Sequence, residues 1–181
     1  MAKQGSDGGW RAELVGDLEG DVLEIGVGTG ENLRFYRGAT RLFAVEPDAG
    51  RADEARQAAR SAAIPVTIEV ASAERLPYED QRFDHVVSSM VFCSVDQPGD
   101  ALREIERVLR PNGVLHMMEH VLPGNPLLAV LFRAITPVWR RLAWNCHLDR
   151  PTVETLREHG WEVEVHKRWL VFVRISARQG R

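Results

Sequence analysis

Three glycines at alternate positions follow a short apolar run near the start of the chain. Residues 22–30 read VLEIGVGTG, which separates Gly26, Gly28 and Gly30 by one residue each. Glycine permits positive φ angles and lets the main chain approach a ligand closely. A glycine turn directly after a strand is therefore a typical place for a cofactor to lie on the backbone. Glu24, inside the run, counts among the predicted contacts of that cofactor.

The spacing of these glycines argues against a cofactor that carries phosphates. The dinucleotide fingerprint needs its third glycine three residues after the second, and Glu31 occupies that position here. A carboxylate there would face a pyrophosphate with the wrong sign of charge. We therefore expect a ligand without phosphates, and we do not expect a nicotinamide-dependent oxidoreductase.

Two further segments can complete a nucleoside site. Glu46 follows the predicted strand 41–45, twenty residues beyond Gly26, and a carboxylate can accept hydrogen bonds from both hydroxyls of a ribose. Residues 72–77, SAERLP, follow the next predicted strand and can present main-chain amides and a polar side chain to an adenine edge. These groups all lie at the carboxyl ends of predicted strands, where open α/β sheets bind ligands.

Short apolar runs alternate with helical patterns, which is typical of a parallel sheet with helices on both faces. The predicted strands are residues 22–25, 41–45, 66–70, 83–88, 113–118, 162–166 and 170–175. The predicted helices are residues 11–18, 31–36, 47–63, 100–110 and 151–159. Because the chain has 181 residues with no repeat or linker, the sequence predicts one α/β domain over 1–181.

Charge and cysteine usage narrow the class of protein further. The formal net charge of −3 provides no basic field for nucleic acid. Residues 1–10 lack the apolar core of a secretory signal, and no run reaches the ~18 apolar residues of a membrane span, so we expect a soluble, cytoplasmic protein. Cys93 and Cys146, the only cysteines, form no closely spaced ligand set. We therefore expect a reducing compartment and no metal site.

Four stretches together resemble the class I S-adenosylmethionine-dependent methyltransferases. They are VLEIGVGTG at 22–30, VEP at 45–47, AERLPYEDQRFD at 73–84 and RVLRPNGVL at 107–115. The resemblance implies a doubly wound, Rossmann-like α/β domain with a mostly parallel seven-stranded sheet, strand order 3-2-1-4-5-7-6 and an antiparallel last strand. It also implies S-adenosylmethionine as cofactor and S-adenosylhomocysteine as product.

The same resemblance assigns the cofactor-binding residues, one of which departs from the usual pattern. Many relatives carry aspartate where this chain has Ser72, so we expect an adenine contact that is either weaker or supplied by Glu74. The predicted cofactor-binding residues are Glu24, Gly26, Gly28, Gly30, Glu46, Pro47, Ser72, Ala73, Glu74, Ser89 and Met90.

A finer resemblance points to one group of these enzymes. VFCSV at 91–95, MEHV at 118–121, PVW at 137–139 and NCHL at 145–148 are similar to the alkyl-thiol S-methyltransferases of animal microsomes and their bacterial relatives. Those animal proteins carry an N-terminal membrane anchor. Residues 1–10 show no such segment, so we do not expect that mode of attachment here.

The segment 121–148 is too long for an ordinary connection, and we expect it to be a substrate-side insertion or lid. Its part at 126–144 combines apolar residues with arginines, which suits either peripheral membrane contact or a solvated face. Four apolar side chains could line an acceptor pocket, although core packing explains them equally well. These are Leu131, Phe132, Trp139 and Trp144.

Two histidines are candidates for the catalytic base. Methyl transfer from a sulfonium is an in-line displacement in which the protein mainly positions the reactants. A hydroxyl or amine acceptor gains from a base, whereas a thiol can ionise by itself near neutral pH. His120, at the end of the fifth predicted strand, and His147, in the long segment, are placed for this role. A structural, hydrogen-bonded role is the alternative for both.

The sequence leaves three functions open. The first is methylation of a thiol, amine or hydroxyl on a small, apolar acceptor, and the second is methylation of a phospholipid headgroup amine. The third is a cofactor-binding module without catalysis, because helix 11–18 offers little cover for the site, so that a lid is either missing or supplied by the second subunit of a homodimer. Nucleic acid is not an expected partner, since residues 88–91 read SSMV in place of the Asn/Asp-Pro-Pro-aromatic pattern of amino-methylating DNA enzymes.

Overall fold

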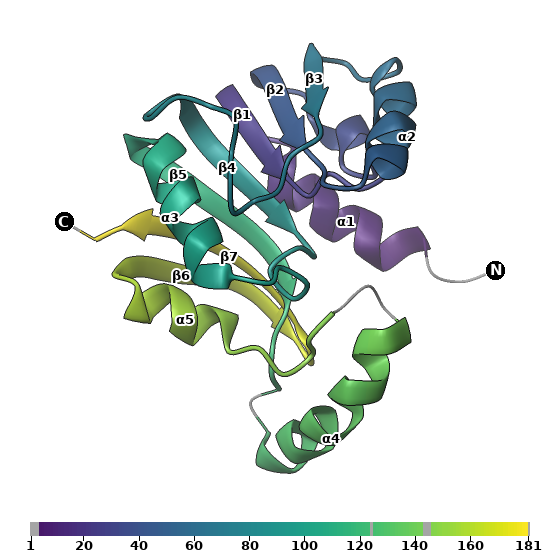
Figure 1. The fold of residues 1–181 in the computed structure, drawn as a ribbon, viewed down its shortest axis with the longest axis vertical. Coiled ribbons are helices and arrows are strands. Elements are labelled where there is room, and N and C mark those ends of the chain that lie inside the picture. The colour runs from purple at the N-terminus through teal and green to yellow at the C-terminus, as the bar shows by residue number, and fades with distance from the viewer. Residues whose placement is uncertain (1–3, 124, 143–145, 181) are drawn as a thin grey trace.

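A twisted seven-stranded sheet occupies the centre of the computed structural model, which describes residues 4–123, 125–142 and 146–180 (Figure 1). The strands lie in the order β3-β2-β1-β4-β5-β7-β6, which confirms the predicted order. Pairs from β3 to β5 are parallel, whereas β7 runs antiparallel to both β5 and β6. The strands are β1 (Gly20–Ile25), β2 (Ala39–Val45), β3 (Val66–Glu69), β4 (Phe83–Ser89), β5 (Leu109–His120), β6 (Trp161–Trp169) and β7 (Phe172–Gln179).

Helices cover both faces of this sheet, as the alternation of buried side chains along the strands requires. Val22 of β1 packs with α1 (Gln4–Val15) and α2 (Ala49–Ala59) on one face. Leu23, its neighbour, packs on the other face with α3 (Pro98–Val108) and α5 (Thr152–Glu158). In α3 the buried residues Leu102, Ile105 and Val108 recur at helical spacing, so one stripe of the helix faces the core.

The predicted helix over 31–36 is wrong, because only the short 3₁₀ turn η1 (Leu33–Phe35) forms there. The side chains on either side of this turn are used for buried hydrogen bonds to β1 instead. Asn32 and Tyr36 both donate to the carboxylate of Glu24. The chain after the glycine turn is therefore held by its side chains, which leaves no room for two full turns of α-helix.

The long segment after β5 consists mostly of a helix, α4 (Pro126–Leu142), which the sequence pattern did not resolve. Figure 1 shows α4 standing apart from the two helical layers that cover the sheet. Seven large apolar residues in this helix are exposed: Leu127, Val130, Leu131, Ile135, Val138, Trp139 and Leu142. No helix in the described part of the chain has both the length and the apolar character needed to cross a membrane.

Candidate active site

The glycine turn and Glu46 meet at the carboxyl ends of two paired strands. Ile25 of β1 lies beside Val45 of β2, so the residues that follow both strands emerge at the same edge of the sheet. The main-chain N–H of Gly28 donates to Oε2 of Glu46 at 2.9 Å, and that of Asp48 donates to Oε1 at 3.3 Å. The carboxylate is buried, with only its side-chain edge reaching the cleft beside it. Its position is therefore fixed by the backbone of the turn.

Two of the glycines are required by space as well as by backbone conformation. Gly26 has φ +61°, and a Cβ placed on it would lie 2.5 Å from Cγ2 of Val91. Gly30 has φ +89°, and its Cβ would lie 2.8 Å from Cδ1 of Leu33. Gly26 lines the cleft, whereas Gly30 lies outside it, where the turn packs against α2. The two residues thus have different tasks in the same motif.

A buried network of polar side chains holds Glu24 beneath the turn. Its Oε1 accepts a hydrogen bond from Asn32 Nδ2 at 2.6 Å, and its Oε2 accepts one from Tyr36 Oη at 3.0 Å. Asn32 in turn accepts a hydrogen bond from Arg11 of α1 at 2.7 Å. Burial of the carboxyl raises the pKa of Glu24 to about 7, although both hydrogen bonds and the Arg11 charge lower it.

A cleft of about 590 Å³ brings together all the predicted cofactor-binding residues except Gly30. The predicted residues that line it are Glu24, Gly26, Gly28, Glu46, Pro47, Ser72, Ala73, Glu74, Ser89 and Met90. Of the two candidate bases, His120 lines the cleft and His147 does not. Met90 is held at φ +63°, a conformation that side chains rarely adopt. Backbone strain of this kind is often found at active sites and ligand-binding segments.

The cleft also contains residues that the sequence analysis did not single out. Arg11 and Asn32 reach it through α1 and the turn after Gly30, and Arg51 reaches it from α2. α1 begins earlier than the predicted helix over 11–18, and Arg11, the residue of α1 that lines the cleft, lies within the predicted range. The sequence separation between Arg11 and Glu24 follows no recognisable motif. Only the tertiary fold brings α1 to the site.

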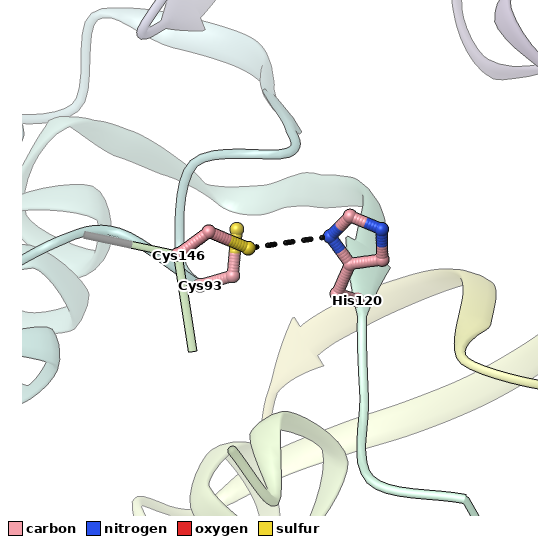
Figure 2. Close-up of side chains that lie close together, drawn as sticks. All are labelled: Cys93, His120 and Cys146. Carbon is pink, nitrogen blue, oxygen red and sulfur yellow. Dashed lines mark hydrogen bonds between the residues drawn. The ribbon is translucent and has the colours of Figure 1, made fainter. Parts of the chain in front are cut away.

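Beyond the glycine turn, the cleft ends in a cluster of two thiols and an imidazole (Figure 2). Sγ of Cys146 lies 3.5 Å from Nδ1 of His120. Cys93 is buried, with 1% of its surface exposed. The interaction with the neighbouring Cys93 thiol lowers the pKa of Cys146, and the reciprocal interaction together with burial raises the pKa of Cys93. Cys146 is therefore the thiol that ionises first.

The predicted apolar wall of the acceptor pocket is present in part. Trp139 lines the cleft, and Phe132 packs against the pair of cysteines. Leu131 is 52% exposed and faces solvent. Trp144 and Asn145 lie outside the described residues. The predicted acceptor pocket therefore draws on one face of α4 and leaves another face of this helix exposed.

Comparison with known proteins identifies the family. A methyltransferase domain model matches residues 23–117, just over half of the chain. Thiol S-methyltransferase TMT1B of Rattus norvegicus is 30% identical over 175 residues, which cover 86% of this chain and 67% of the relative. The ubiquinone/menaquinone biosynthesis C-methyltransferase UbiE of Ectopseudomonas mendocina is 35% identical over 127 residues, covering 66% and 50%. The crystal structure of YcgJ from Bacillus subtilis superposes with a TM-score of 0.77 at 15% identity, covering 96% and 97%.

The chain belongs to the methyltransferase domain family, and it is an S-adenosylmethionine-dependent methyltransferase. It spans between 57% and 67% of the length of the thiol S-methyltransferases that it matches. The cleft fits the methyl donor, since its volume lies within the roughly 300–1,000 Å³ of small-molecule sites. The bare turn at Gly26 and the buried carboxylates of Glu24 and Glu46 also suit a ligand that carries a sulfonium and an ammonium group.

The raised pKa of Glu24 predicts a pH-dependent stability of the donor-free protein. The folded-state pKa lies above the unfolded value of 4.5, so the folded state holds this proton more tightly. The contribution of Glu24 is then complete below pH 4.5 and is lost as the pH rises to about 7, a loss of up to about 3 kcal/mol. We expect Glu24→Gln to remove this slope in urea unfolding curves recorded across that range. The exposed carboxyl of Glu54 provides the control variant Glu54→Gln, and a wild-type slope in Glu24→Gln would contradict the assignment.

Proposed function

We propose that this enzyme transfers the methyl group of S-adenosylmethionine to the thiol of a small, apolar molecule. The proposal rests mainly on the chemistry of the two ends of the cleft. One end presents the buried carboxylates of Glu24 and Glu46, and the other presents Cys93, Cys146 and the indole of Trp139. The first end suits a cationic donor, and the second is apolar and polarisable, which suits an acceptor carrying sulfur on an alkyl or aryl group.

The donor would be held by residues with distinct tasks. Glu46 can accept from the ribose hydroxyls while the Gly28 N–H keeps its carboxylate in place. Glu24 is placed to attract the ammonium group of the methionine moiety. Ser72, Ala73 and Glu74 line the cleft where the adenine edge would lie. When bound, the donor supplies an electrophilic methyl group, and the protein's part is to hold an acceptor in line with it.

A thiol acceptor places few demands on acid–base chemistry. Its thiolate is the nucleophile, and a thiol with pKa near ~8.5 is already partly ionised at neutral pH. His120 is the only one of the two candidate histidines positioned to act on the acceptor, because it lines the cleft. The main-chain N–H of His147 instead donates to the carbonyl of Cys93 at 2.7 Å. We therefore assign His120 to the acceptor and His147 to the loop that carries Cys146.

Two kinds of relative define the competing acceptors. The relatives named as thiol S-methyltransferases favour sulfur, whereas those named as C-methyltransferases of ubiquinone and menaquinone biosynthesis favour a ring carbon. Methylation at carbon needs a base to remove the ring or phenol proton. The cluster of thiols beside His120 favours sulfur, since it offers a soft, apolar surface at the end of the cleft.

We expect transfer to alkanethiols to increase with the length of the alkyl chain. Each methylene that enters the apolar end contributes up to about 0.8 kcal/mol, or about fourfold in kcat/KM. The measurement uses donor labelled at the methyl group with a series of alkanethiols. Amines and alcohols of the same chain lengths are the matched controls, and reduced demethylmenaquinone tests carbon. Faster transfer to carbon, nitrogen or oxygen than to sulfur would contradict the proposal, and saturable donor binding without transfer to any acceptor would favour a module without catalysis.

We further propose that α4 rests on an anionic membrane surface, from which an apolar acceptor can enter the cleft. The helix leaves a broad apolar face exposed and carries Arg133, Arg140 and Arg141 with no acidic residue between 126 and 142. Apolar residues combined with cations are typical of helices that lie in the membrane interface. A second copy of the chain docked on the same face would bring like charges together, so a homodimer through α4 is disfavoured.

The membrane proposal predicts sedimentation with vesicles that contain phosphatidylglycerol. We expect the double variant Leu127→Glu/Val138→Glu to remain in the supernatant, because both side chains are exposed on α4 and neither lines the cleft. The exposed residues Gln57 and Ala63, which lie away from α4 in and just after α2, give the charge-matched control Gln57→Glu/Ala63→Glu, which we expect to sediment like the wild type. Equal sedimentation of the double variant would contradict the proposal. Labelled phospholipid among the products would instead identify a headgroup amine as the acceptor.

A further inference from the structure

Cys93, His120 and Cys146 come from three separate parts of the fold and converge at one point. Cys93 lies in the turn after β4, His120 ends β5, and Cys146 follows α4. One potential ligand atom of each residue lies within 4.8 Å of the other two. Figure 2 shows the two sulfur atoms close together, with that of Cys146 turned toward the imidazole. Within the described part of the chain, this group has the composition of a metal site.

The geometry of the cluster suits zinc. Zinc binds thiolates at about 2.3 Å and imidazole nitrogen at about 2.0–2.1 Å, which gives a tetrahedron with S···N and S···S edges of about 3.6–3.8 Å. Sγ of Cys146 already lies 3.5 Å from Nδ1 of His120. Two thiolates and one imidazole are the ligands that zinc takes in catalytic sites with an open fourth position. Small side-chain rotations would bring all three atoms onto one ion.

The surrounding hydrogen bonds hold the backbone of each ligand. The carboxylate of Glu119, next to His120, accepts from Ser88 Oγ at 2.6 Å and from the main-chain N–H of Val91 at 3.0 Å. This fixes the turn that carries Cys93 against the end of β5. The N–H of His147 donates to the carbonyl of Cys93, which fixes the segment that carries Cys146. Such support is what a metal site needs, because ligand orientation depends on the groups behind it.

We propose that Cys93, His120 and Cys146 form a zinc site whose open fourth position faces the cleft. All three residues line the same cleft as the glycine turn and Glu46, so an ion held between them borders the space for the acceptor. Two thiolates neutralise the charge of the ion, and His120 then serves as a ligand. The fourth ligand is the thiolate of the acceptor, and this part of the inference rests on the proposed thiol methylation.

The site would select the acceptor and make it reactive. The acceptor thiol releases its proton to water as its sulfur takes the open position, and the thiolate keeps a lone pair for the methyl carbon. The new sulfur–carbon bond forms as the sulfonium–methyl bond of the donor breaks, leaving S-adenosylhomocysteine and a thioether. The thioether is neutral and binds zinc more weakly than a thiolate, so the product leaves the metal. An amine or alcohol of the same shape gains less from this site, because zinc prefers the softer sulfur here.

Metal binding can be measured without donor or acceptor. Untagged protein, purified with reductant and without oxygen, is titrated with zinc against a chromophoric chelator, and then with cobalt as a spectroscopic probe. We expect one equivalent of either metal, with the thiolate-to-cobalt charge-transfer band and visible bands of tetrahedral coordination. Cys93→Ser, Cys146→Ser and His120→Gln should each weaken zinc binding by more than the roughly 10–100-fold cost of losing a residue that supports a ligand. The exposed His159 gives the control His159→Gln.

The cobalt spectrum of the wild type keeps the test independent of how the variants fold. The proposed zinc site would be overturned if the protein with both thiols reduced bound less than one equivalent of zinc, or if its cobalt spectrum lacked thiolate bands. A disulfide between Cys93 and Cys146 in the protein that binds donor would also overturn it. Addition of an alkanethiol should shift the cobalt bands, and chelation should abolish thiol methylation until zinc is restored. Methylation of thiols that persists after complete removal of metal would overturn the role of zinc and leave the proposed function intact.

Discussion

The hydrogen bond from the Gly28 N–H to the buried carboxylate of Glu46 is the contact on which the rest of the site depends. It joins the segments that follow β1 and β2, and it forms because the parallel register places Ile25 beside Val45. A carboxylate buried without such a partner would be costly. The same bond orients the acid toward the cleft and fixes the turn whose bare backbone forms the cleft floor. The fold and the donor site are therefore tied together at one point.

The two ends of the cleft follow from different parts of the fold. The proposed donor end consists of residues that follow β1, β2 and β3, which the parallel sheet brings to one edge. The proposed acceptor end consists of the turn after β4, the last residue of β5 and the chain that returns from α4. The first end thus rests on the sheet itself. The second end depends in part on the insertion that carries α4, which stands apart from the helical layers on the sheet (Figure 1).

The convergence of the glycine turn and Glu46 at one edge of the sheet could be predicted from the sequence because its signals are local. Three glycines after an apolar run and Glu46 after the next strand have the spacing of a nucleoside site, and the strands are short apolar runs between turns. The grouping of Arg11 and Asn32 around Glu24 could not be predicted, since it requires α1 to cross the end of the sheet. The helix predicted over 31–36 does not form, because buried hydrogen bonds from this segment to β1 outweigh the local helical preference. These bonds, too, depend on the tertiary fold.

The acceptor end was the least predictable part. Cys93, His120 and Cys146 are far apart in the sequence, and each by itself has an ordinary structural explanation. Their convergence depends on the path of the chain after β5, for which the sequence indicated only an unusually long connection. The prediction that the protein has no metal site rested on the absence of closely spaced ligands. Spacing along the chain is informative when ligands share one loop, and it carries no information when three elements supply one ligand each.

Calorimetric titration with S-adenosylmethionine provides the most direct test of this account. Glu46→Gln keeps an oxygen that the Gly28 N–H can bond but loses the charge that a ribose diol prefers, so affinity should fall by roughly 10- to 100-fold. Glu46→Ala also loses the support of the turn, and its affinity should fall further. The exposed carboxyl variant Glu54→Gln should bind the donor like the wild type. Unchanged affinity in Glu46→Ala would show that the donor does not lie on this carboxylate, and the account of the site would be wrong.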